Sequence, residues 1–201
     1  MRIRPEFLRS LNRTVDLARL EESRHTIFAL TPELRLAYFN PAWLEFAAMN
    51  GAPRLSADWP LGRSVMAAVP AALRRFYLDG YASVLAGGRP WETAYAAPTP
   101  WRDRSYRMRV DLVGPRAGLV CNHILAHDLP WTDEPRPADE RRYRHGDGRL
   151  HQCVSCRRFT APGAASWDRV PAWLAHAPAR LSPLLCPGCH VCYFPSQARA
   201  A

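Results

Sequence analysis

The sequence LRLAYFNPAWLEF, residues 34–46, carries the clearest fold signal in this chain. It begins with an apolar run typical of a strand and continues through Asn40-Pro41 into a second apolar run. Asparagine can cap a helix by accepting from a free backbone N–H, and proline fits the first helical position because its missing N–H has no partner there. The stretch therefore predicts a strand that ends at Asn40, then a short helix over 42–49 closed by Asn50-Gly51.

The segments around this stretch extend it into a sheet. His25–Leu30 is an earlier apolar run, and Thr31-Pro32-Glu33 has the composition of a hairpin turn. A longer helix is predicted from Pro70, with a glycine pair after it, and three strands are expected at 91–97, 106–112 and 118–127. This order predicts an α+β fold with a five-stranded antiparallel sheet and helices on one face.

Residues 1–24 are predicted to form an N-terminal amphipathic helix. Its apolar side chains recur at helical spacing on one face and are Phe7, Leu8, Leu11, Val15 and Ala18. Such a face can pack on its own domain or pair with a second copy of the chain, and periodicity does not separate the two.

Residues 25–128 resemble a PAS domain, and the strand that runs into the Asn40-capped helix is the most telling part of that resemblance. The resemblance implies a sensory or dimerising module that can enclose a ligand without catalysis of its own. Flavin-binding members carry a reactive cysteine in a local motif, which is missing between Asn40 and Gly88. Haem-binding members carry an axial histidine on the longer helix, which is missing from 70–85. We therefore expect no flavin and no haem, and a small apolar ligand stays a candidate.

Two C-x-x-C pairs near the carboxyl end form the sharpest chemical signal. They are Cys153-Val-Ser-Cys156 and Cys186-Pro-Gly-Cys189, with 29 residues between them. Two residues between cysteines let one tight turn direct two sulfurs at one ion, so two turns complete a tetrahedral zinc site. Four thiolates leave no open coordination position, which favours structural Zn²⁺ over catalytic zinc. We therefore predict a small zinc-ribbon-like module over 151–195.

Three nearby side chains remain alternative ligands: Cys192, His190 and His151. The sequence Cys186-Pro-Gly-Cys189-His190 also spells a haem-attachment signature, which we exclude because the chain has no export signal. A thioredoxin-like role is disfavoured on the expectation that this cysteine pair does not open a helix after a buried strand. Between the pairs, helical spacing predicts a helix that packs over the metal centre with Trp167, Val170, Trp173 and Leu174.

Residues 151–195 resemble a cysteine-rich tail found after PAS domains in some bacterial signalling proteins. In that tail the first cysteine pair is followed by basic residues, here Arg157 and Arg158, and by a tryptophan-containing stretch, here 167–173. The resemblance supports reading the two cysteine pairs as one unit.

Composition places the chain among globular proteins. All 27 basic residues are arginine, against 18 acidic residues, and they are spread along the chain. Residues 129–150 have the composition of an exposed linker, and 196–201 form a terminal tail. We find no leader and no apolar run of membrane-spanning length, so a cytoplasmic location without membrane contact is expected, where cysteines are thiols or ligands rather than disulfides.

These features predict a non-enzymatic PAS-type sensory or protein-interaction protein with a structural zinc site, acting through a protein partner or as a homodimer. A first alternative is a zinc-dependent nucleic-acid-binding regulator that uses the arginines of the linker and first cysteine turn, namely Arg141, Arg142, Arg144, Arg149, Arg157 and Arg158. A second alternative is a thiol redox protein acting through Cys186 and Cys189.

Overall fold

The computed structural model describes residues 3–4, 7–8, 15–49, 52, 54–114 and 117–195. Three sequence expectations lie outside these residues: Leu11, the Asn50-Gly51 helix stop, and the tail 196–201. The chain divides into two compact units, the first made of 1–69, 73–94 and 107–125, the second of 70–72, 95–106 and 126–201. No helix in the described part combines the length and the apolar character needed to cross a bilayer.

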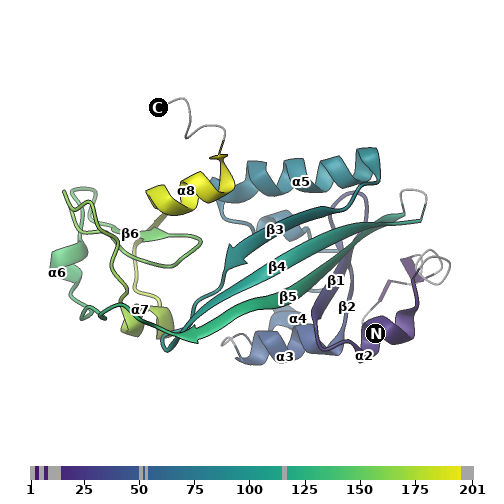
Figure 1. Cartoon of the computed structure of the whole chain (residues 1–201), viewed down its shortest axis with the longest axis horizontal. Helices are drawn as coiled ribbons and strands as arrows, with labels where there is room; N and C mark the ends of the chain where they lie inside the picture. Colours follow the sequence, from purple (N-terminus) through teal and green to yellow (C-terminus); the bar gives the residue numbers. More distant parts are fainter. Residues whose placement is uncertain are drawn as a thin grey trace. The chain divides into compact units, whose positions relative to one another are not determined.

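A five-stranded sheet forms the centre of the fold, in the order β2-β1-β5-β4-β3 (Figure 1). Its strands are β1 (Thr26–Leu30), β2 (Leu36–Phe39), β3 (Trp91–Ala96), β4 (Arg102–Val113) and β5 (Gly118–Pro130). β1 lies antiparallel to both β2 and β5, with Phe28 opposite Phe39 on one side and Cys121 on the other. The predicted α+β class with a five-stranded antiparallel sheet is confirmed, although β4 and β5 are longer than expected.

Asn40 joins β2 to helix α3 (Pro41–Met49) and is completely buried. Its Oδ1 accepts from the backbone N–H of Trp43 at 3.1 Å, which confirms the predicted helix cap, and from that of Ile27 at 3.0 Å. Its Nδ2 donates to the backbone carbonyls of Leu20, Ser23 and His25 at 3.1, 3.3 and 2.9 Å. One amide therefore holds the starts of α3 and β1 and the preceding segment together.

Helix α5 (Arg74–Gly87) is the predicted long helix, and Figure 1 shows it running beside β3. The expected start at Pro70 is wrong, because residues 71–73 form a 3₁₀ turn before the α-helix begins. Gly88 ends the helix in the left-handed region, with φ of 67°. Gly80 is required by packing, since a Cβ there would lie 2.4 Å from the ring of Trp91 on β3. The helices α4 (Leu55–Asp58) and a 3₁₀ turn (Val65–Ala67) lie between α3 and α5 in the chain.

The predicted N-terminal helix is interrupted. Phe7 and Leu8 are helical, residues 9–14 lie outside the described part, and Val15 and Asp16 are not helical. α2 spans Leu17–Glu22, and Asp16 caps it by accepting from the N–H of Ala18 at 3.0 Å. Phe7 is buried in a cluster with apolar side chains of β1 and β2 and Val15 packs against that cluster, whereas Ala18 is exposed. Within the described residues, part of the predicted apolar face therefore packs on its own unit.

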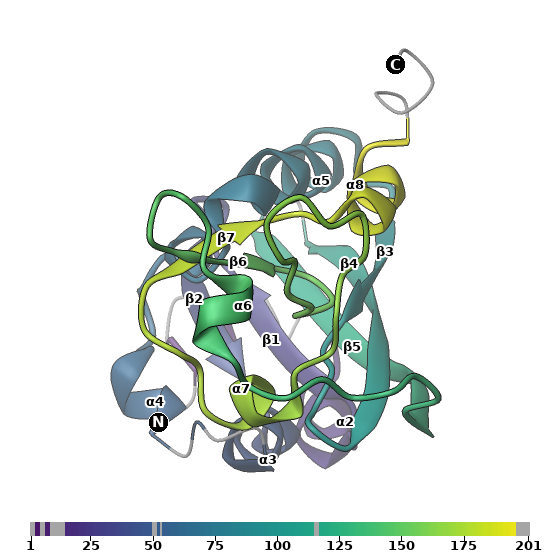
Figure 2. The ribbon, with the colours of Figure 1, turned by 90° about the vertical axis from the view of Figure 1, so that its left-hand side faces the viewer.

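The carboxyl-terminal unit contains α6 (Glu140–Tyr143), β6 (Leu150–Cys153), α7 (Pro171–Ala175), β7 (Leu181–Leu184) and α8 (Pro187–Tyr193). β6 and β7 pair in parallel (Figure 2), a pairing that the sequence did not predict. A buried cluster packs here, made of Tyr143, Leu150, Phe159, Val170 and Trp173. Tyr143 comes from the segment expected to be linker. Trp167 precedes α7, so the predicted helix through 167–174 is limited to its last turn.

Candidate metal centre

The first cysteine pair sits on a tight turn at the end of β6. Cys153 is the last residue of the strand, and its N–H donates to the carbonyl of Arg158 at 2.8 Å. The N–H of Arg157 returns to the carbonyl of Cys153 at 3.0 Å, and Arg157 adopts φ of 61°. This left-handed residue closes the turn around Cys156 in a conformation that glycine adopts more easily.

The second pair opens α8. Cys186 is the N-cap residue, its Sγ accepts from the N–H of Cys189 at 3.4 Å, and Pro187 occupies the first turn. β7 ends two residues earlier, at Leu184. The expectation that this pair does not open a helix is therefore wrong, because the proline starts a helix at once. The strand before it differs from the thioredoxin-like pattern, since no residue of β7 is buried.

The parallel pairing of β6 with β7 brings the two cysteine turns together. Cys153 lies opposite Leu184, and the N–H of Val154 donates to the Leu184 carbonyl at 2.8 Å. As a result, four sulfur atoms from distant parts of the sequence lie within 4.8 Å of one another, those of Cys153, Cys156, Cys186 and Cys189. The arrangement is compatible with a metal site.

The alternative ligands lie elsewhere. Among the described residues, the group of ligand atoms that can hold an ion consists of the four paired thiols. Cys192 is exposed. The ring of His151 stacks on that of His145 at a centroid distance of 3.6 Å, and its Nε2 lies 3.2 Å from an oxygen of Asp147.

The thiols perturb one another strongly. Hydrogen bonds from Cys156 and Cys189 lower the pKa of Cys153, which favours a thiolate there. The hydrogen bond with Cys153 raises the pKa of Cys156, and it raises that of Cys189 to about 12. Several thiolates this close repel one another, and a dication bound between them removes that repulsion. The donor set of four sulfurs fits a tetrahedral soft metal site.

Two supporting interactions were not apparent from the sequence. Ser155, inside the first cysteine turn, shares a buried hydrogen bond of 3.2 Å with the hydroxyl of Tyr193 on α8. This bond ties the two cysteine-bearing elements directly. Neither residue belongs to a recognisable sequence motif. The only signal in the sequence is that each residue carries a hydroxyl group and lies near a cysteine pair.

The second support is an ion-pair cluster, named here the Asp133 strap, which is made of Trp131, Asp133, Arg158 and Arg169. Asp133 accepts from Nη1 of Arg158 at 2.6 Å and from Nε of Arg169 at 3.0 Å, and both guanidinium groups lie about 5 Å from the Trp131 ring centre. Burial raises the pKa of Asp133, but the bonds from the two arginines outweigh it and lower that pKa overall. The Asp133 strap thereby fixes Arg158, two residues after Cys156.

No protein-family model matches the sequence, and no curated protein matches it. Among solved structures, the chain is similar to the PAS domain of BvgS from Bordetella pertussis, with 19% identity over 55% of this chain and 82% of that chain and a TM-score of 0.43. It is also similar to the PAS domain of an HTR-like protein from Haloarcula marismortui, with 15% identity over 56% and 92% of the two chains and a TM-score of 0.37. A third similar structure is the VqmA dimer of Vibrio cholerae, with 14% identity, 62% and 58% coverage and a TM-score of 0.39. Likenesses this distant transfer no ligand or partner to this chain.

Proposed function

We propose that this chain is a non-enzymatic PAS-type sensory or interaction protein whose carboxyl-terminal module folds around one structural zinc ion. The observation that carries the proposal is the convergence of four thiols from two separate turns, with every sulfur within 4.8 Å of the others. Cys153, Cys156, Cys186 and Cys189 would hold the ion. Zinc supplies no redox step, and four protein sulfurs leave no position for water or substrate, so its role there is to crosslink the chain.

The small size of the local core supports a structural role. The apolar cluster of the module contains five buried residues, and its regular elements are four to seven residues long. Segments this short gain little stability from packing alone, and metal coordination contributes on the order of 10 kcal/mol in small zinc peptides. The ion would therefore reinforce contacts between elements that the small core stabilises only weakly.

The sensory part of the proposal rests on the PAS-like sheet. In this reading the first unit receives a small apolar ligand or a protein partner, and the zinc module presents a surface to a partner protein or a second copy. The sensory function is inferred from the fold class, and its test is the direct detection of a ligand or partner bound to the first unit.

Metal analysis tests the proposal. Elemental analysis and native mass spectrometry of the protein purified under reducing conditions should give one zinc per chain. Tetrahedral sulfur sites also suit iron, which would give a coloured protein and a different element. Cys156→Ser should abolish stoichiometric zinc, whereas Cys192→Ser, which changes an exposed cysteine outside the cluster, should keep it. A metal-free wild-type protein that stays folded would refute the zinc site.

A thiol redox protein is a second candidate, because one observation favours it. Cys186-Pro-Gly-Cys189 begins helix α8 two residues after the end of strand β7, with Cys186 as the helix N-cap. In such a reaction, the two thiols form a disulfide and pass two electrons and two protons to a substrate disulfide, which becomes two thiols. Disulfide mapping after glutathione titration separates the candidates, since the redox reading requires a reversible Cys186–Cys189 bond in protein that carries no metal.

The nucleic-acid reading gains little from the arrangement of its arginines. Arg142, Arg144 and Arg158 lie within 3.6 Å of carboxylates of Asp168, Glu140 and Asp133 respectively. Arg157 is largely buried, which lowers its pKa. Paired and buried guanidinium groups are poor contacts for phosphates, so we do not favour this function.

A further inference from the structure

A hollow beside α6 lies at the opposite end of β6 and β7 from the cysteine turns. It has a volume of about 290 Å³ and is lined by Glu140, Arg144, Gly148, Leu150, Ala179 and Arg180. A neighbouring hollow of about 300 Å³ shares Gly148 and Arg180 and adds Asp147 and Arg149. The two together offer room for a small molecule.

The charges around the hollow are unequally matched. Glu140 is bound by Arg144 at 2.9 Å, and Asp147 accepts from the backbone N–H of Arg149 and from His151. Three arginines thus face two carboxylates that already have partners. Within the described part of the chain, the guanidinium groups of Arg149 and Arg180 have no carboxylate within ion-pair distance. The excess positive charge therefore lies on these two arginines, and Arg180 is the one that lines both hollows.

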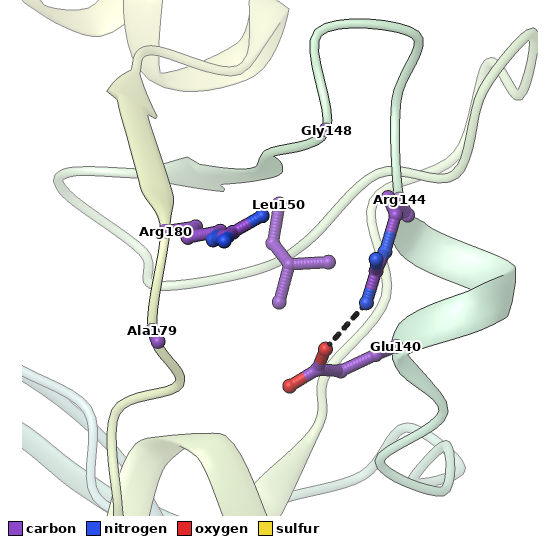
Figure 3. Close-up of a pocket in the computed structure, with 6 residues that line it drawn as sticks. All are labelled: Glu140, Arg144, Gly148, Leu150, Ala179 and Arg180. Atoms are coloured by element: carbon purple, nitrogen blue, oxygen red, sulfur yellow. Dashed lines mark hydrogen bonds and ion pairs between the residues drawn. The ribbon is translucent and has the colours of Figure 1, made fainter.

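The backbone fixes the position of Arg180. Its φ is 59°, a conformation that residues with a side chain rarely adopt, and its carbonyl accepts from the N–H of Leu150 at 3.1 Å. Figure 3 shows its side chain extending toward Leu150, with the Arg144–Glu140 pair on the far side. The floor is apolar because Leu150 is 2% exposed and belongs to the core of the module. Gly148 has φ of 74° and no side chain, which leaves the rim open.

We infer that this hollow binds a small oxyanion ligand through Arg180. The ligand would carry a carboxylate or phosphate group that accepts two parallel N–H bonds from the planar guanidinium of Arg180, with Arg144 as a second donor. Neither the metal nor the sensory sheet takes part in this contact.

Solution NMR with two probes tests the inference. ¹⁵N-labelled protein is titrated with sodium phosphate and, separately, with sodium butyrate, at constant ionic strength set by sodium chloride. The amide signals of Gly148, Leu150 and Ala179 should shift and saturate, with a Kd on the order of 1 mM for at least one probe. Saturation by phosphate alone identifies a phosphate site, and saturation by butyrate alone identifies a carboxylate site.

Two variants make the test specific. Arg180→Asn removes the guanidinium but keeps a residue that tolerates the left-handed backbone, and it should weaken binding about tenfold or more. Arg141→Gln removes the same charge from an exposed position on α6 that does not line the hollow, and its affinity should stay within about twofold of the wild type. Unchanged spectra elsewhere and equal metal content establish that both variants fold. Equal weakening in both variants, or shifts that grow linearly without saturation for both probes, would overturn the inference.

Discussion

Each of the two units contains a buried cluster of polar groups, around Asn40 in the first and around the four cysteines in the second, and the two are satisfied in different ways. In the first unit, the Asn40 amide makes five hydrogen bonds to backbone groups, so the protein itself satisfies the donors and the acceptor of this side chain. In the second, four thiols face one another, and the hydrogen bond between Cys153 and Cys156 lowers the pKa of the first and raises that of the second. The comparison teaches that a neutral amide can serve as a hub by itself, whereas the charge of a group of ionisable sulfurs can be balanced by a bound cation.

The surroundings of the two centres also differ. The unit that contains Asn40 has many fully buried apolar side chains, such as Leu30, Val110 and Leu119. The cysteines lie at and just beyond the ends of two four-residue strands, in a unit whose apolar cluster has five buried residues. Apolar burial therefore maintains the first unit, and we expect coordination to maintain the second.

Removing the metal should produce the largest difference between the two units. With zinc chelated under reducing conditions, residues 140–193 should lose protection from hydrogen exchange, because about 10 kcal/mol of coordination energy is withdrawn. Amides of β1 and β5 should keep their protection. Exchange mass spectrometry of chelated and metal-loaded protein measures both. Loss of protection throughout the sheet would show that the units do not depend on separate sources of stability.

Asn40→Ala should be the most damaging single substitution in the first unit. It leaves buried backbone groups of several segments without partners, at a cost of about 4 kcal/mol in the free energy of unfolding. Asn40→Ser is the informative companion, because a hydroxyl can still cap the N–H of Trp43 but cannot reach three carbonyls. Chemical denaturation should place the serine variant between alanine and wild type. Equal stability of all three proteins would contradict the hub.

The first unit should also lose stability in mild acid through His123 on β5. Burial lowers the pKa of His123 from 6.5 to about 4, so the unfolded chain takes up the proton first as the pH falls. The contribution of neutral His123 to the free energy of unfolding is complete above pH 6.5 and is lost progressively toward pH 4. It amounts to at most about 3 kcal/mol. Urea denaturation at several pH values should show a flatter profile for His123→Gln. An identical profile for both proteins would remove His123 as the cause.

Two glycines of α5 provide the smallest and best-matched comparison. Gly80→Ala places a methyl group against the Trp91 ring and should cost about 2 kcal/mol, because either the ring or the helix must move. Gly87→Ala meets nothing within 4 Å and should stabilise the helix by about 0.5 kcal/mol. Thermal unfolding of both variants gives the difference. The same sign for both would show that the contact with Trp91 does not position α5.

Much of the first unit could be predicted because its signals are local. Strand alternation, the Asn40-Pro41 helix start and the glycine stop at Gly88 each depend on neighbouring residues. The errors occurred where a few residues near a helix end compete, as with the 3₁₀ turn after Pro70 and the Asp16 cap. Such boundaries depend on individual hydrogen bonds that periodicity does not report.

The candidate site was predicted in its cysteines but not in its supports. Ligand identity follows from spacing, because C-x-x-C is a property of one turn. The Ser155–Tyr193 bond and the Asp133 strap join residues 38 and 25 or more positions apart, and neither pair has a pattern of its own. The helical start at Pro187 was also missed, since strand β7 before it has a proline and no clear alternation.

By itself, the sequence determined the order of strands and helices along the chain of the sheet domain, the Asn40 cap and the four cysteines, because each is encoded within a few neighbouring residues. Only the tertiary structure decided that the two cysteine turns meet, that β6 and β7 run parallel, and that Arg180 faces an open hollow beside a paired Arg144 and Glu140. These are contacts between segments about 30 residues apart. Their formation depends on loop closure and packing, which no local pattern records.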